Sequence, residues 1–255
     1  MGHNNKCLAI LTELGDNVIF NYRVALSLPK LFRRINEIIP QLKRMGADSL
    51  FLIAITSAFT GLVTAVQASY QTKGYIPVNL ISVMIGKSMM IELAPVLTAL
   101  VLSGKIGAAI AAEIGSMRVS EQIDALESMG IDPIEYLYLP RIAAGILILP
   151  ILTVYSNIIG IFSAYFVSKF HYNVNFFTFF NNMKHYFQPT DLWGGIVKSI
   201  FFGMVITSIG CYIGNKAKGG AEGVGEVATL TVVYSSILIL IMDFVVAAIL
   251  FGGHK

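Results

Sequence analysis

The sequence has little charge for its length. Asp, Glu, Lys and Arg make up 13% of its 255 residues, whereas soluble domains carry about 25%. Hydrophobic residues make up 55% of the chain, and the mean hydropathy is +0.71. Because so few polar side chains cannot cover a folded surface in water, the composition excludes an ordinary soluble domain. It indicates an integral membrane protein.

Cysteine and histidine are also scarce. Two cysteines, Cys7 and Cys211, cannot form a disulfide framework, and they match no metal-ligand spacing. The histidines are scattered over terminal and connecting segments: His3, His171, His185 and His254. We therefore expect neither a metal site nor a catalytic cluster.

A phosphate loop is missing as well. Gly86-Lys87-Ser88 resembles the end of the pattern GxxxxGK[ST], but Ile81 stands where the first glycine belongs, within an apolar stretch. The chain is therefore not expected to hydrolyse ATP, to bind a cofactor or to be an enzyme. No basic groove is visible either, so nucleic acid is not an expected partner.

Five apolar stretches are each long enough to cross the hydrocarbon core of a bilayer. In lipid they must be helices, because β-barrel strands would be shorter and alternating. The sequence thus predicts an all-α membrane protein, with a five-span domain over residues 49–255. The expected spans are Ser49–Tyr70, Leu80–Leu102, Ile142–Ser168, Leu192–Gly214 and Ala228–Gly252.

Residues 1–48 form a separate N-terminal segment in which basic residues alternate with apolar ones. This pattern is typical of an amphipathic helix that lies in the membrane interface with its cations at lipid headgroups. A solvated helix preceding the membrane domain is the alternative. We expect Pro29 and Pro40 to break the segment into pieces.

The distribution of basic residues predicts the orientation. About twelve Lys and Arg lie in the N-terminal segment and in the connections after the second and fourth spans, against about four on the other side. The positive-inside rule then places the N-terminus in the cytoplasm and the C-terminus outside. The aromatic outer connection Lys169–Asp191 is expected to form a surface or re-entrant helix, and the glycine-rich stretch Gly214–Glu226 a mobile loop.

The connection after the second span, about residues 106–133, contains the most distinctive motif. Val119, Ile123 and Leu126 recur at helical spacing among charged residues, which predicts a short amphipathic helix. Gly130 follows as a C-cap, and Pro133 stops the helix. Such a helix can dock into a groove on a partner or simply lie on the membrane, and periodicity does not decide between them.

This connection carries a family resemblance. Its stretch AEIGSMRVSEQIDALESMGIDP is similar to the central motif of MlaE-type permeases. IELAPVLTAL, GGIVKSIFFG and YSSILILIMDFVVAAILFG also resemble that family, so the likeness runs from about Ile38 to the C-terminus. It implies a permease of the bacterial inner membrane, with an interfacial helix and five spans, that moves phospholipid in connection with outer-membrane lipid trafficking.

The resemblance also implies partners. In that family the permease is a homodimer that works with two cytoplasmic ABC ATPases, which bind the ATP, and with MCE-domain substrate-binding proteins. The family's coupling helix, which contacts the ATPase, corresponds to this connection. The implied contact residues are Glu113, Gly115, Met117, Arg118, Glu121, Asp124, Leu126, Glu127 and Gly130.

Lys198 and Asp243 are ionisable residues within predicted spans. Counted from the outer ends of the fourth and fifth spans, their depths differ by about 5 Å at 1.5 Å per residue. Because an unpaired charge inside the membrane is costly, we predict that the two side chains form a buried structural ion pair.

Glu92 lies deep in the second span, and Pro95 three residues later is expected to kink that helix. A carboxylate beside a kink suggests a cavity wall, although it could equally be a hydrogen-bond acceptor between helices. Many relatives have Arg-Glu where this chain has Ile91-Glu92, and Lys87, one turn earlier, could supply the missing cation. By position alone, the first span would add Val63, Val66, Gln67 and Tyr70 to a lipid cavity.

Two other classes of function remain open. An ion-coupled secondary transporter could use Lys87, Glu92, Lys198 and Asp243 as a proton relay, and a membrane scaffold would bind no substrate. Copurification with an ATPase, transport driven by a proton gradient, and the absence of bound lipid would separate these possibilities.

Overall fold

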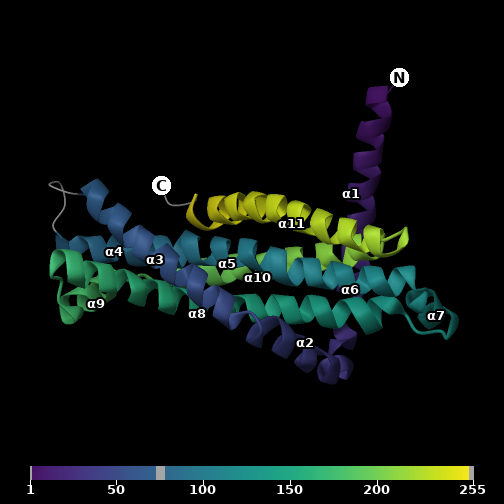
Figure 1. Ribbon diagram of the computed structural model, residues 1–255, viewed down its shortest axis with the longest axis horizontal. Helices are drawn as coiled ribbons and strands as arrows, with labels where there is room; N and C mark the ends of the chain where they lie inside the picture. Colours follow the sequence, from purple (N-terminus) through teal and green to yellow (C-terminus); the bar gives the residue numbers. More distant parts are fainter. Residues whose placement is uncertain (1, 73–77, 253–255) are drawn as a thin grey trace. The chain divides into compact units, whose positions relative to one another are not determined.

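The computed structural model describes residues 2–72 and 78–252, and the regular elements among them are helices (Figure 1). The N-terminal part contains α1 (Gly2–Ser27), the 3₁₀ turn η1 (Leu28–Arg34) and α2 (Ile35–Ala47), followed by α3 (Leu50–Thr72). Because an all-helical chain satisfies its own backbone hydrogen bonds, this architecture suits a bilayer.

A nearly continuous helical run follows, interrupted by wider π turns. It comprises α4 (Val78–Ser88), η2 (Met89–Leu93), α5 (Ala94–Leu102), η3 (Ser103–Gly107) and α6 (Ala108–Val119). After the short α7 (Gln122–Ser128), a third π turn, η4 (Ile134–Tyr138), leads into α8 (Leu139–Tyr172). The remaining helices are α9 (Phe176–His185), α10 (Pro189–Gly214) and α11 (Gly220–Phe251).

Five of these helical stretches are long and apolar enough to cross a membrane, which confirms the predicted spans. They run over Leu50–Gln71, Leu80–Val119, Ile134–Phe170, Pro189–Gly214 and Gly220–Leu250. The second and third extend well beyond the predicted limits, because polar residues at their ends continue the helix without adding to the apolar signal. The chain is an all-α multi-pass membrane protein.

The sequence expectations about breaks and connections had different outcomes. Pro29 lies at the start of η1, where the helix changes character, as expected. Pro40 was wrongly expected to break the chain, since it lies inside α2; a proline removes one backbone hydrogen bond, and the rest of the helix persists. The expected loop Gly214–Glu226 is also shorter than predicted, because α11 already begins at Gly220. The outer connection does contain a helix, α9.

The chain divides into two compact units, and α8, α10 and α11 contribute a segment to each. Unit 1 comprises residues 1–45, 103–145 and 204–237. Unit 2 comprises residues 46–102, 146–203 and 238–255. Each unit has its own set of buried side chains.

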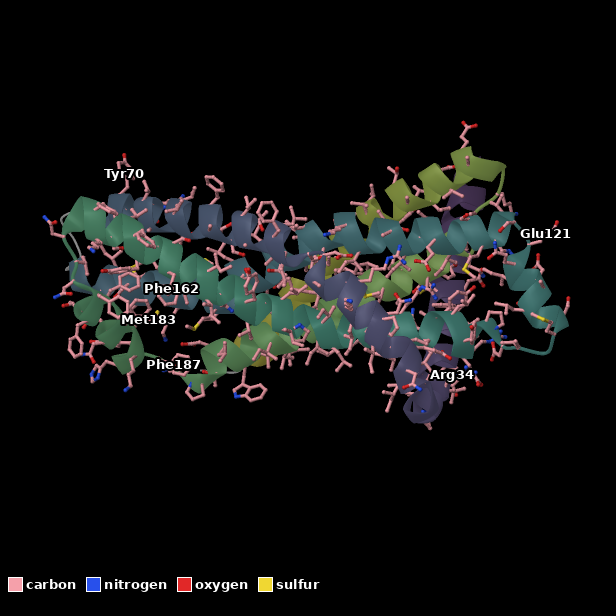
Figure 2. The ribbon with its side chains drawn as sticks, turned by 60° about the horizontal axis from the view of Figure 1, so that its bottom comes forward. Arg34, Tyr70, Glu121, Phe162, Met183 and Phe187 are labelled. Carbon is pink, nitrogen blue, oxygen red and sulfur yellow. The ribbon has the colours of Figure 1, made fainter. Side chains whose placement is uncertain are left out.

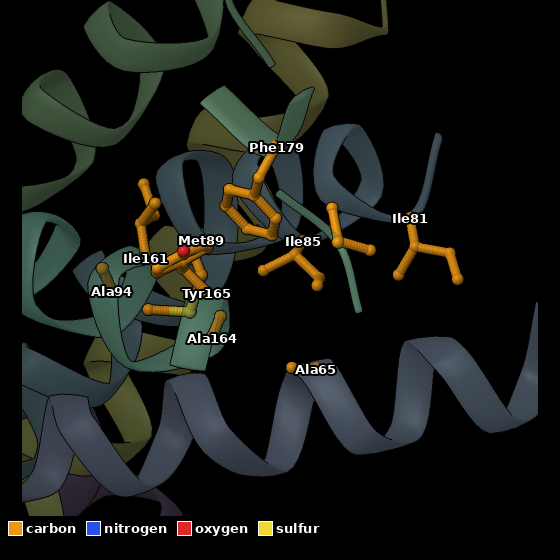
Figure 3. Close-up of a cluster of buried hydrophobic side chains, with 10 residues drawn as sticks. Ala65, Ile81, Ile85, Met89, Ala94, Ile161, Ala164, Tyr165 and Phe179 are labelled. Carbon is orange, nitrogen blue, oxygen red and sulfur yellow. The ribbon is translucent and has the colours of Figure 1, made fainter. Parts of the chain in front are cut away.

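The apolar core of unit 2 gathers around Phe179 of α9. This side chain is almost fully buried and lies beside Ile85 of α4, while Tyr165 of α8 and Ala65 of α3 complete the cluster (Figure 3). The rings of Tyr165 and Phe179 meet edge to face, with centroids 5.6 Å apart. Of the aromatic residues of the outer connection, Phe179 and the partly buried Phe180 therefore pack into the core and hold α9 against α4.

The helices α3 and α8 approach each other closely at two glycines in unit 2. A side chain added at Gly61 would collide with the backbone carbonyl of Gly160. One turn away on α3, Ser57 and Ser156 share a hydrogen bond of 2.7 Å between their hydroxyls. Small residues let two membrane helices reach this distance, which is how they gain packing energy in lipid.

Replacing Gly61 by alanine is expected to destabilise the protein, because the carbonyl that the new methyl group meets belongs to a helix backbone and cannot rotate away. Overpacking of this kind costs about 1–3 kcal/mol, which should lower the thermal unfolding midpoint in detergent by about 5 °C. Gly225→Ala is the matched control, since its added Cβ meets open space. Equal midpoints for the two variants would argue against the close contact.

Candidate functional site

A cavity of about 730 Å³ opens in unit 2 between α3 and the helices of the second span. One wall is a single face of α3, whose residues recur every three or four positions. Its main contributors are Phe59, Thr60, Val63, Thr64, Gln67 and Gln71. This wall mixes apolar groups with hydroxyl and amide groups that can form hydrogen bonds, and none of these six side chains is charged.

The opposite wall belongs to α4, η2 and α5. It consists of Met84, Ile85, Ser88, Glu92, Leu93 and Leu97. Glu92 is the only charged side chain among the described residues that line the cavity. A volume of this size lies within the range of about 300–1,000 Å³ typical of small-molecule sites.

The backbone around Glu92 is a π turn. Met89–Leu93 adopts the wider helix, and the amide of Ala94 donates to the carbonyl of Met89. Pro95, next along the chain, has no amide hydrogen to donate. The sequence predicted a disturbance of the helix at this point, and the structure shows it as a π turn with Glu92 inside it. Such turns are often found at functional sites.

Glu92 belongs to a charged triad. The ammonium of Lys198 on α10 lies 2.6 Å from Oε1 of Glu92 and 2.8 Å from Oδ1 of Asp243 on α11. Lys198 is fully buried, whereas the Glu92 side chain is 44% exposed and that of Asp243 22%. The predicted contact of Lys198 with Asp243 is confirmed, and Glu92 is a third member that the sequence argument did not assign to it.

Lys87 does not have the place suggested by the sequence. It lies 3.4 Å from the buried carboxylate of Asp191, near the start of α10, and it is not among the residues that line the cavity. Lys87 and Glu92 are five residues apart, which is more than one helical turn, so they do not share a face. The cation beside Glu92 is Lys198.

The four first-span residues predicted to line a lipid cavity lie on two faces of α3. Val63 and Gln67 line the cavity, but Val66 and Tyr70 do not. Tyr70 is 80% exposed and points away from the helices (Figure 2). The helical repeat explains this, because Val66 and Tyr70 lie on a neighbouring face of α3. The threonines of α3 were missed, although their spacing from Gln67 and Gln71 could have revealed them.

The connection in unit 1 differs from the expected single helix. α6 continues to Val119, and the chain then turns sharply at Glu121, whose φ of 59° is left-handed (Figure 2). Val119 is therefore not on the same helix as Ile123 and Leu126, and the predicted three-residue stripe is wrong. Ile123 is buried within unit 1, while Leu126 is half-buried.

The end of α7 matches the sequence prediction. Gly130 has a φ of +76°, and its amide donates to the carbonyl of Glu127. The amide of Ile131 reaches back to Leu126. These two hydrogen bonds form a Schellman cap, in which glycine adopts the left-handed conformation without a steric cost. α7 is thus a short, well-capped helix.

Of the remaining residues assigned to coupling, Glu113 and Gly115 on α6 contact other residues of unit 1. Glu113 accepts hydrogen bonds from Arg44 of α2 at 2.5 Å and from buried Arg141 of α8 at 2.6 Å. Gly115 packs against Ala217 and Val227.

Farther along the connection, Arg118 bridges to Asp124 at 2.5 Å, and Met117 is half-buried. The exposed part is Glu121, Asp124, Glu127 and Gly130. Any partner that docks here would therefore meet an acidic surface on α7.

Comparison with known proteins gives consistent matches. A family model described as "Permease MlaE" matches residues 38–249. A Rickettsia felis protein named "Probable ABC transporter permease protein" is 37% identical over 96% of this chain and 95% of its own. The Haemophilus influenzae "Intermembrane phospholipid transport system permease protein MlaE" is 30% identical over 94% of this chain and 92% of its own. The chloroplast protein TRIGALACTOSYLDIACYLGLYCEROL 1 of Arabidopsis thaliana is 37% identical over 84% of this chain and 61% of its own.

Proposed function

Because this chain belongs to the MlaE permease family, we propose that it is the membrane subunit of an ATP-driven phospholipid transporter. The names of two relatives support a lipid substrate, since one refers to phospholipid transport and the other to a galactolipid. Like other transport subunits, the chain performs no chemical step itself. It would bind the lipid and control when the bound lipid can enter or leave the cavity.

The observation that carries this proposal is the cavity of unit 2. Its α3 wall offers Phe59 and Val63 to acyl chains, while Gln67 and Ser88 can bond to glycerol or phosphate oxygens. Glu92 places a charge on the wall between α4 and α5. A long amphiphile matches this combination better than a small ion does, because an ion needs no apolar wall.

Energy would come from a separate ABC ATPase, since this sequence has no phosphate loop. We assign its docking surface to α7 and the turn before it, where Glu121 and Glu127 are exposed. The Arg44–Glu113–Arg141 cluster ties α2, α6 and α8 together in the same unit. A displacement of the connection would therefore be transmitted along α6 rather than lost in a flexible loop.

The assembly would be a homodimer that also contacts an MCE-domain protein, in the inner membrane of a bacterium. The N-terminus would lie in the cytoplasm and the C-terminus in the periplasm, as the basic residues suggest. In this orientation α7 is cytoplasmic, on the side where ATP is available.

Reconstitution tests the proposal directly. The chain would be purified with its ATPase and MCE-type partners and placed in vesicles that contain a fluorescent phospholipid. Lipid transfer that requires ATP, and that stops when the ATPase is inactivated, is the expected result. A chain that neither binds lipid nor retains an ATPase would instead be a scaffold, contrary to the proposal.

The triad of Lys198, Glu92 and Asp243 favours a second candidate, an ion-coupled secondary transporter, because clustered intramembrane charges can carry protons. The same vesicles distinguish the two mechanisms. Transfer that follows an imposed pH gradient, without ATP or ATPase, would favour ion coupling. Transfer that needs ATP and ignores the gradient would exclude it.

A further inference from the structure

The triad in unit 2 has one negative charge too many. Two carboxylates, from Glu92 and Asp243, share the single ammonium of Lys198. With all three groups ionised, the net charge is −1. A surplus charge inside a membrane protein is costly unless a cation or a hydrogen-bond donor meets it.

Of the three residues of the triad, Glu92 is the one whose side chain can contact a ligand in the cavity. Lys198 is fully buried, and only Glu92 of the three lines the cavity, with 44% of its side chain exposed. Should Glu92 turn toward the cavity, Asp243 at 2.8 Å would still neutralise Lys198. The surplus charge is therefore available at the cavity wall without leaving the buried ammonium alone.

The cavity supplies no compensating cation of its own among the residues that the structure describes. Neither lysine nor arginine appears in its described lining. Lys87, adjacent to the lining residue Ser88, is held at 3.4 Å by Asp191. The other polar side chains of the described lining, such as Gln67 and Gln71, are neutral.

We propose that Glu92 selects phospholipids whose headgroup carries an ammonium, such as phosphatidylethanolamine, over phospholipids with a net negative charge. The ammonium would pair with the Glu92 carboxylate, while neutral amides and hydroxyls of the cavity would bond to the phosphate. An anionic lipid such as phosphatidylglycerol would bring a second negative charge to a wall that already carries one. This inference rests on the proposed lipid transport and specifies its substrate.

Competition for binding is the test. The full chain in detergent would be equilibrated with equal amounts of palmitoyl-oleoyl phosphatidylethanolamine and phosphatidylglycerol, and the bound lipids would be quantified by mass spectrometry. The wild-type chain should bind the ethanolamine lipid about tenfold better, the ratio that about 1.4 kcal/mol produces. Glu92→Gln should bring the ratio close to one, whereas Glu222→Gln, which removes an exposed carboxylate on α11, should leave it unchanged.

A second variant keeps the test valid if Glu92→Gln does not fold. Gln67→Lys adds a cation to the cavity at an exposed position of α3, a helix that holds no member of the triad, and it should shift the ratio toward the anionic lipid. An unchanged ratio in Gln67→Lys, or equal binding of both lipids by the wild-type chain, would overturn the selectivity and leave lipid transport standing. If the wild-type chain binds no lipid at all, both proposals fail.

Discussion

Replacing Lys198 by methionine should remove most of the folded protein. Lys198 is fully buried between two carboxylates, at 2.6 Å from Glu92 and 2.8 Å from Asp243. Methionine keeps much of the side-chain volume but leaves these carboxylates facing each other without a cation. Removing one partner of a buried ion pair costs about 3–5 kcal/mol, a large fraction of the stability of a typical domain. The monodisperse fraction in detergent-based size-exclusion chromatography measures the loss.

Combined variants then test whether the loss of folded protein comes from the unpaired carboxylates. Lys198→Met with Asp243→Asn should recover part of the yield, and adding Glu92→Gln should recover most of it, because no ionised group of the triad then lacks its partner. Lys218→Met removes an exposed cation and should leave the yield unchanged. If the losses of the single variants simply add in the double variant, the residues do not act as a unit and the triad is not what stabilises these helices.

Reversing the charge of Glu121 should release the proposed ATPase partner. Glu121 is exposed at the turn between α6 and α7, so its side chain is free to meet a partner. Lysine occupies the left-handed backbone position no worse than glutamate does, since both have an unbranched side chain with a Cβ. Retention of the ATPase on an affinity-tagged permease should therefore fall tenfold or more while the permease itself stays folded.

The control for this experiment is the same reversal at Glu222, another exposed glutamate, near the start of α11. Retention should persist in Glu222→Lys at the wild-type level. A partner lost equally from both variants would point to a general effect of charge. A partner retained by Glu121→Lys would place the docking surface elsewhere.

Several elements could be predicted from the sequence because a single physical requirement determines them. The five spans follow from apolar length, and the approach of Lys198 to Asp243 follows from their similar depth and the cost of a lone charge. Gly130 was predicted because only a left-handed cap ends a helix in this way. In each case the requirement concerns either neighbouring residues of the sequence or the depth of a residue in the membrane.

Rotation about the helix axis was harder to predict. Depth in the membrane does not indicate which face of α3 meets the cavity, so Val66 and Tyr70 were assigned to it although they lie on a neighbouring face. The available signal was the polar side chains that share one face of α3, namely Thr60, Thr64 and Gln67. The neighbour of Glu92 was also missed, because depth alone could not choose between Lys87 and Lys198. The turn at Glu121 could not be predicted either, because glutamate rarely adopts a left-handed backbone conformation and the sequence carries no local signal of it.

The close contact of Gly61 with Gly160 has a mechanical consequence for the cavity. It fastens α3 to α8, and the hydroxyl bond between Ser57 and Ser156 adds a second fixing point nearby. Because α3 is held to α8 at these two points, the α3 wall of the cavity cannot shift unless α8 moves with it. The opposite wall is the one that can deform more easily, because the π turn and Pro95 leave its helix with fewer regular hydrogen bonds.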